Sequence, residues 1–385
     1  MTPARRAAAL IAAVLMLFAA AAPAAADTIR EQQWPLESVG ARVAWETTKG
    51  AGVTVAVLDT GVDDRHPDLK GATLPGKDVV GFGASRGDRA WARHGTAMAG
   101  IIAGRGHGPG GEDGVLGVAP EAEVLPVRVL LEDGDPERSR ARSSRSGALA
   151  EGIRWAVDNG ADVVNLSLGD DSESAHPDPR EDAAVRYALR KGAVVVASAG
   201  NGGEEGDRAS YPAAYPGVIA VTAVDRYGAR ASFSTRRWYT TVSAPGKDIV
   251  IADPDGTYYS GWGTSAAAAM VSGAAALVRS AHPDLSPAQV KRLLADTADN
   301  TPAGGRNDAL GTGVVNAAAA IEVGGNIAPE PQSPVAEPFG TEHFGGGPPS
   351  EGVSPADWLP LAAGALGVLL LAGAVTLYRG RPPGG

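Results

Sequence analysis

One stretch, residues 259–279, restricts the fold of this chain more than any other. From Ser265 to Val278 it consists of alanine and other small or apolar residues, so it predicts a helix that is apolar on every face. Such a helix must be buried, and the rest of the chain must therefore surround it. Ser265 would lie in its first turn, where free backbone N–H groups and the helix dipole favour negative charge. Taken alone, Ser265 fits a helix cap as well as a nucleophile.

Continuous apolar, β-branched runs elsewhere predict strands that are buried on both faces. These runs are residues 53–58, 124–129, 163–168, 193–197 and 218–224. Helical patterns lie between or after them, at residues 94–103, 147–158, 181–191 and 286–298, and residues 314–323 close the domain. Strands that alternate with helices predict an α/β fold, a three-layer, doubly wound and mostly parallel sheet. Ligand sites in such a fold lie at the carboxyl ends of the strands.

The start of the chain predicts export. Residues 1–26 carry two arginines near their start, Arg5 and Arg6, followed by an apolar run and then small residues, which is the order of a secretory signal peptide. A retained membrane anchor is the alternative interpretation of this segment. A polar N-terminal extension at 27–52, with two tryptophans that can pack across the next domain, precedes the main domain at 53–325.

The end of the chain predicts a membrane anchor. Residues 326–357 form a linker rich in proline and glycine, and residues 358–378 are apolar over nearly the length that a transmembrane helix needs. The arginines of the tail, 379–385, would then face the cytoplasm, with the main domain outside the cell membrane. A buried core helix, or a tail removed during processing, is the alternative.

Composition excludes some classes of function. The net charge of −10 argues against a nucleic-acid partner, and the absence of cysteine excludes disulfides and thiolate metal sites. Residues 132–146 are dense in charged and serine residues, which predicts an exposed, mobile surface loop. Its arginines are also consistent with a site of proteolytic nicking.

Four polar residues at predicted strand ends and helix starts match the parts that amide hydrolysis through serine requires. Asp59 ends the first strand, and His94 begins an apolar helix. Asn201 follows another strand, where it can donate to an oxyanion together with the Ser265 backbone N–H. The alternative for Asn201 is a left-handed turn between glycines. Ser167, Leu168 and Gly169 form a further strand end at which an extended peptide could pair.

The motifs around these residues resemble those of the subtilisin-type serine proteases, in that family's order of Asp, His and Ser. The matching motifs are Asp59-Thr60-Gly61, His94-Gly95-Thr96, Gly117-Val118-Ala119-Pro120, Asn165 to Gly169, Ala199-Gly200-Asn201, Tyr211 to Pro216 and Gly263-Thr264-Ser265. The resemblance implies a triad of Asp59, His94 and Ser265, an oxyanion hole of Asn201 and the Ser265 N–H, and a peptide extended along 167–169. Ser210 is the expected floor of the pocket nearest the scissile bond.

The flanking segments resemble those of the mycosins, membrane-anchored subtilases associated with type VII secretion systems. That resemblance implies a protease outside the cell membrane that processes secreted proteins and acts on protein or peptide substrates. No cofactor is predicted for it. Two features depart from the pattern: mycosins typically carry cysteines, and the proline usual four residues after the nucleophile is Ala269 here. The loop at 108–114 offers only two carboxylates, so no calcium site is predicted.

Two other functions compete with this interpretation. The protein could be mainly a structural subunit that stabilises a secretion complex, with protease activity secondary. A lipase or esterase is disfavoured because its nucleophile elbow needs a glycine two residues after the serine, where this chain has Ala267.

Overall fold

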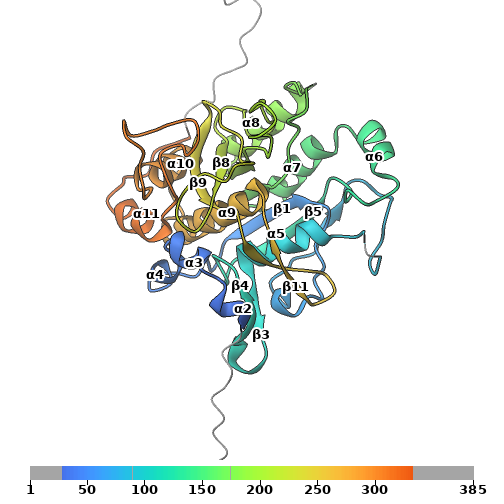
Figure 1. Cartoon of the computed structure of the whole chain (residues 1–385), viewed down its shortest axis with the longest axis horizontal. Helices are drawn as coiled ribbons and strands as arrows, with labels where there is room; N and C mark the ends of the chain where they lie inside the picture. Colours follow the sequence, from blue (N-terminus) through green and yellow to red (C-terminus); the bar gives the residue numbers. More distant parts are fainter. Residues whose placement is uncertain (1–27, 89, 174, 333–385) are drawn as a thin grey trace, which may run out of the picture. The chain divides into compact units, whose positions relative to one another are not determined.

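The computed structural model describes residues 28–88, 90–173 and 175–332 (Figure 1). The predicted signal peptide, transmembrane helix and tail lie outside these residues, as does most of the linker. Within the described ranges no helix has both the length and the apolar character needed to cross a bilayer.

A seven-stranded sheet forms the centre of the domain, with the strand order β2-β5-β1-β6-β7-β8-β9 and parallel pairing throughout. The strands are β1 (Thr54–Asp59), β2 (Lys77–Asp78), β5 (Glu123–Arg128), β6 (Val163–Leu166), β7 (Val194–Ser198), β8 (Ile219–Val224) and β9 (Thr240–Pro245). The five predicted strands are confirmed to within one or two residues. Sequence patterning missed β2, which has two residues, and β9, whose Thr, Ser and Pro hide a strand that is buried along its whole length.

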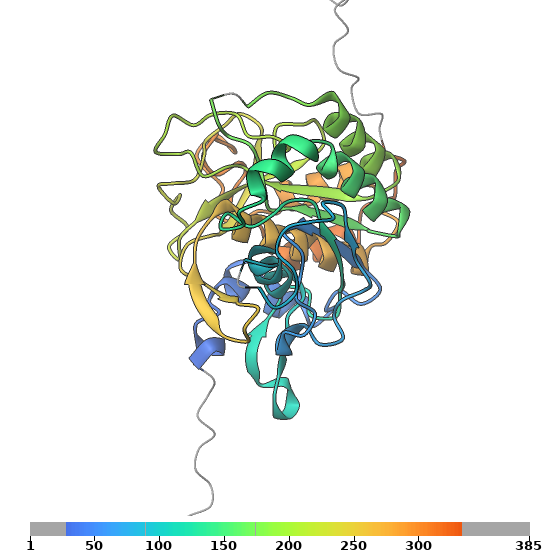
Figure 2. The ribbon, with the colours of Figure 1, turned by 90° about the vertical axis from the view of Figure 1, so that its right-hand side faces the viewer.

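Helices cover both faces of this sheet, which gives the predicted three layers. They are α5 (Arg93–Ala103), α7 (Ala148–Asp158), α8 (Pro179–Arg190), α9 (Thr264–Ala281), α10 (Pro287–Asp296) and α11 (Ala317–Gly324). In β1, Val55 and Val57 belong to the core that contains α5 and α9, whereas Ala56 and Leu58 belong to the core beneath α7 and α8. Figure 2 shows α7 and α8 in green on one side of the sheet and α9 in orange on the other.

The helix α9 is the buried helix that the sequence required. Every residue from Ala266 to Val278 is buried, and α9 lies against α5 and the central strands. The approach is close: a Cβ atom added at Gly273 would lie 2.6 Å from the Cβ of Val118. Small side chains therefore let α9 pass through the centre of the domain.

The N-terminal extension is part of the same folded unit. It contains α2 (Thr28–Glu31), α3 (Pro35–Ser38) and α4 (Ala41–Ala44). Leu36 and Val39 are buried in the core that contains α9. The side-chain amide of Gln33 pairs with both the carbonyl oxygen and the N–H of Leu116, at 2.8 and 3.0 Å, and the Trp45 indole donates to the Val118 carbonyl at 2.8 Å. The predicted packing of this segment on the domain is confirmed.

The charged stretch 132–146 is not simply a loop, because it contains the helix α6 (Arg138–Ser144). Ala141 packs with Val80 and Leu131 in a small separate core. Asp135 is buried and accepts a hydrogen bond from the Ala84 N–H at 2.7 Å. A few apolar contacts and one buried, hydrogen-bonded carboxylate order this stretch. Neither produces a periodic pattern in the sequence.

Short elements complete the described residues. They are the hairpin β3 (Arg105–His107) and β4 (Asp113–Leu116), the hairpin β10 (Ile249–Ala252) and β11 (Tyr258–Gly261), and the 3-10 turns η1 (Pro67–Leu69) and η2 (Pro109–Gly111). The loop at 108–114 is thus the tip of the β3–β4 hairpin.

Candidate active site

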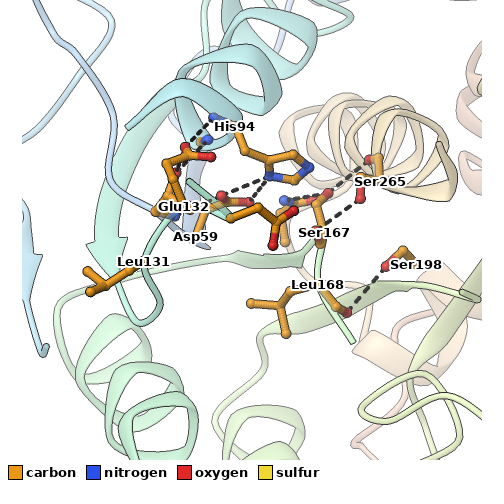
Figure 3. Close-up of polar contacts among 12 residues, drawn as sticks. Asp59, His94, Leu131, Glu132, Ser167, Leu168, Ser198 and Ser265 are labelled. Carbon is orange, nitrogen blue, oxygen red and sulfur yellow. Dashed lines mark hydrogen bonds and ion pairs between the residues drawn. The ribbon is translucent and has the colours of Figure 1, made fainter. Parts of the chain in front are cut away.

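The fold brings the predicted residues together from separate elements. Asp59 is the last residue of β1, and His94 is the second residue of α5. Asn201 follows β7, and Ser265 is the second residue of α9. Figure 3 shows the His94 imidazole between the Asp59 carboxylate and Ser265, which lies at the start of its helix.

The Asp59 carboxylate and the His94 ring form a hydrogen-bonded pair. Both carboxylate oxygens lie 2.9 Å from Nδ1 of His94, and the Thr60 N–H donates to Oδ1 at 2.7 Å. The side chain of Asp59 is 1% exposed and that of His94 is 38% exposed. Burial lowers the pKa of His94, but the charge and hydrogen bond of Asp59, with the charges of Glu132 and Asp133, outweigh it and raise this pKa to about 9.

A close backbone approach fixes where His94 stands. A Cβ atom added at Gly95 would lie 1.9 Å from the carbonyl oxygen of Gly61, so only glycine lets the first turn of α5 reach the end of β1. The Thr96 hydroxyl then accepts a hydrogen bond from the Asp63 N–H at 2.8 Å. The motifs at 59–61 and 94–96 are thereby explained as two halves of one junction.

Hydrogen bonds to neighbouring segments fix the backbone around Ser265. Gly263, with a φ of 145°, precedes α9, and its N–H donates to the Gly246 carbonyl at 2.8 Å. The Ser265 hydroxyl donates to the Ser167 carbonyl at 3.1 Å, and the Ser167 hydroxyl donates to the Ser265 carbonyl at 2.8 Å. Ser265 and Ser167 are therefore locked together by two reciprocal hydrogen bonds (Figure 3).

A chain of neutral hydrogen bonds extends this lock into the core. The Ser272 hydroxyl donates to Oδ1 of Asn165 at 2.9 Å, and Nδ2 of Asn165 donates to the Ser167 hydroxyl at 3.0 Å. Asn165 and Ser272 are fully buried. Ala269, which occupies the position of the expected proline, is also fully buried in the second turn of α9. Sequence reasoning gave no role to Asn165 or Ser272, because their side chains meet only when α9 packs on β6.

The side-chain amide of Asn201 has a fixed orientation. Its Oδ1 accepts hydrogen bonds from both the N–H and the hydroxyl of Thr264, each at 3.0 Å. Nδ2 consequently faces away from Thr264 with its hydrogens available, while the residue itself is exposed. The left-handed conformation in this turn belongs to Gly200, with a φ of 105°, and not to Asn201.

The predicted substrate-binding residues lie side by side. Ser210 is fully buried beneath Gly169, where an added Cβ atom would lie 2.5 Å from the Ser210 Oγ. A short antiparallel bridge between Asp170 and Tyr211 joins the two segments. The carbonyl of Leu168 accepts a hydrogen bond from Ser198 at 3.2 Å. The segment 167–169 thus runs past Ser265 on one side and Ser210 on the other.

Sequence reasoning also missed Glu132, which it assigned to a surface loop. Its Oε1 accepts hydrogen bonds from the His94 N–H and the Thr60 hydroxyl, each at 2.7 Å. Glu132 lies four residues after the end of β5, the neighbour of β1 in the sheet, and this position was the available signal. Among the described residues, no group of three or more histidine and carboxylate side chains is arranged to hold a metal ion.

Comparison with known proteins agrees with this geometry. The sequence profile of the Subtilase family, Peptidase_S8, matches residues 50–313. The chain belongs to the subtilase family. This subtilase is 40% identical over 276 residues to subtilisin DY of Bacillus licheniformis, an alignment that covers 71% of this chain and 92% of that protein. The family resemblance expected from the sequence is confirmed, and with it the assignment as a serine protease.

Solved structures point to a subgroup. This subtilase is similar to MycP1 from Mycobacterium smegmatis, with a TM-score of 0.65 and 29% identity over 80% of this chain and 88% of that one. It is also similar to MycP3 of the type VII (ESX-3) secretion system, with a TM-score of 0.61 and 34% identity over 75% and 87% of the two chains. The expected relation to the mycosins is confirmed.

Proposed function

We propose that this subtilase cleaves peptide bonds with Ser265 as nucleophile, His94 as general base and Asp59 as the group that orients His94. The observation that carries the proposal is the pairing of Asp59 with Nδ1 of His94 while the imidazole faces Ser265. That pairing leaves Nε2 to take the Ser265 proton as Oγ attacks the carbonyl carbon, once the hydroxyl turns from the Ser167 carbonyl toward His94. The same proton then passes to the leaving amine, and water repeats the sequence to release the acyl group.

The negative charge formed on the carbonyl oxygen requires fixed donors. Nδ2 of Asn201 and the backbone N–H of Ser265 are the donors we assign, because Thr264 holds the other end of the Asn201 amide. Ser265 also lies at the positive end of the 18-residue helix α9, which favours the same charge. The substrate backbone would extend along 167–169, with Ser210 at the floor of the adjacent pocket.

Location and substrates follow from the ends of the chain and from the relatives. The predicted signal peptide at 1–26 and apolar segment at 358–378 favour a single-pass protein of the cell membrane, with the protease domain outside. Two proteins of similar structure, MycP1 and MycP3, come from the ESX-1 and ESX-3 type VII secretion systems. We therefore infer that the substrates are secreted proteins, cleaved beside such a secretion complex.

A fluorophosphonate probe tests the chemistry directly, since it reacts with an activated serine. The full-length protein should be labelled at Ser265, and Ser265→Ala should abolish labelling. Ser143→Ala, which changes an exposed serine of α6, is the matched control and should be labelled like the wild type. A folded wild-type protein that remains unlabelled would show that the triad is not functional.

A structural role is the second candidate function, because the proteins of similar structure come from type VII secretion systems. Strains that carry Ser265→Ala and strains that lack the gene separate the two roles. If the protease role dominates, both strains should lose processing of the same secreted proteins. Normal secretion with Ser265→Ala, combined with loss of the complex on deletion, would establish the scaffold role instead.

A further inference from the structure

The helix that carries His94 has no cap of its own. The residue before α5 is Ala92, which has a φ of 57° and no side-chain acceptor for the free N–H groups of the first turn. The acceptors come from the segments that follow two strands, β1 and β5. Oε1 of Glu132 accepts from the His94 N–H at 2.7 Å, and the Thr60 hydroxyl accepts from the Gly95 N–H at 3.1 Å.

One further hydrogen bond joins these two acceptors. The Thr60 hydroxyl donates to the same Oε1 of Glu132 at 2.7 Å. Glu132 thus ties the residue after Asp59 to the backbone of His94, and the two partners of the Asp59–His94 pair are held from behind by one carboxylate. A carboxylate at a helix N-terminus is also favoured by the helix dipole.

We propose that Glu132 is a positioning residue of this active site, which caps α5 from the segment that follows β5 and stabilises the charged imidazolium of His94 during the reaction. The inference rests on the serine protease mechanism proposed above. Glu132 touches neither substrate nor the reacting atoms, and it acts only through His94 and Thr60.

Charge explains why a carboxylate rather than a neutral acceptor stands here. His94 gains a proton when Ser265 attacks, so a nearby negative charge lowers the energy of that step. The groups that face His94 are Asp59 from β1 and Glu132 and Asp133 after β5, and all three raise the pKa of His94.

These charges are not equally available to the imidazole. Asp133 is 93% exposed and forms an ion pair with Arg138 at 2.7 Å. Arg93, the cation next to His94 in sequence, is itself paired with Asp253 at 2.8 Å. Glu132 accepts instead from two neutral donors, the Thr60 hydroxyl and the His94 N–H. After Asp59, Glu132 is therefore the carboxylate whose charge acts most strongly on His94.

The test compares Glu132→Gln, which keeps an acceptor oxygen but removes the charge, with Glu132→Ala, which removes both. The neutral form of His94 is the base, so kcat/KM rises with pH through the pKa of His94. Loss of the Glu132 charge lowers that pKa, so the rising limb for Glu132→Gln should move to lower pH by about 0.5–1 unit. The plateau of kcat should fall about 3–10-fold with little change in KM, and Glu132→Ala should lose more.

Asp133→Asn is the matched control, because it removes an adjacent charge that is exposed and already paired. Its limb should move by less than half as much as that of Glu132→Gln. The wild type alone provides a second measurement. Salt at about 1 M, where the Debye length is about 3 Å, screens the carboxylates around His94, so the rise of kcat/KM should also move to lower pH.

The results separate this inference from the proposed mechanism. Failure of the fluorophosphonate to label the wild type would overturn both. Two results would overturn the role of Glu132 alone, provided that the wild type is labelled. One is a pH profile of the wild type that salt does not move. The other is a Glu132→Gln profile that coincides with that of the wild type or of Asp133→Asn.

Discussion

The helices α5 and α9 each present a reactive side chain from their second residue, but different forces hold them in place. Around Ser265 in α9 the supporting groups are neutral: the Ser167 hydroxyl, the Asn165 amide and the Ser272 hydroxyl, all buried. Around His94 in α5 the supporting groups are the carboxylates of Asp59 and Glu132.

The difference follows the direction in which charge moves in the proposed reaction. Negative charge develops near the start of α9, where an added carboxylate would oppose it, and neutral donors hold the serine without that penalty. Positive charge develops on His94, where carboxylates are favourable. The N-termini of α5 and α9 thus differ in their electrostatic surroundings. Side chains from neighbouring segments place carboxylates beside His94 and neutral groups beside Ser265.

The largest effect should come from removing the buried charge on the α5 side. Asp59→Asn keeps the shape of the side chain but favours the wrong tautomer of His94, so kcat should fall about 10⁴-fold, the loss known for triad aspartates including that of subtilisin. Steady-state cleavage of a peptide substrate measures it, with Asp133→Asn as the control. A loss below tenfold would mean that the charged support of His94 is dispensable.

The next effect should come from the α9 side. Asn201→Ala removes one oxyanion donor, and the expected fall in kcat is about 10²–10³-fold, a magnitude known from subtilisin itself. KM should change little, because the donor acts on charge that exists only in the transition state.

Asn201→Asp sharpens this test, because it places a carboxylate beside Ser265, where negative charge develops in the reaction. It should lose at least as much activity as Asn201→Ala. If Asn201→Asp is the more active of the two variants, the electrostatic contrast between the two helices does not hold.

The layers of the fold were predictable because apolar runs and helical periodicity report burial directly. The same reasoning could not find β9, since Thr240, Thr241 and Ser243 are polar residues that become buried only when the strand joins β8. The extension at 27–52 was predicted to pack on the domain. Its specific partners, such as the backbone of Leu116, depend on tertiary contacts that carry no local signal.

The candidate site was predictable where a motif is local and not where partners are distant. Asp59, His94, Asn201 and Ser265 stand in short motifs at strand ends and helix starts, and the fold brings them together. Glu132 stands in a charged stretch that resembles a solvated loop, and its position after β5 does not by itself identify His94, 38 residues away, as its hydrogen-bond partner. Charge density alone does not distinguish a solvated carboxylate from one that caps a helix.

The smallest effect on catalysis should come from the deepest member of the neutral chain. Ser272→Ala leaves Oδ1 of Asn165 without the Ser272 donor in a fully buried site, which should lower the free energy of unfolding by about 1–3 kcal/mol. Urea unfolding of the detergent-solubilised protein measures this loss, with Ser143→Ala expected to stay within about 0.5 kcal/mol of the wild type. Because Ser167 still holds Ser265 through two hydrogen bonds, kcat should change less than about threefold. If Ser272→Ala instead lowers kcat as much as Asn201→Ala without loss of stability, the neutral chain acts on the chemistry, and α9 depends on its supporting groups as directly as α5 does.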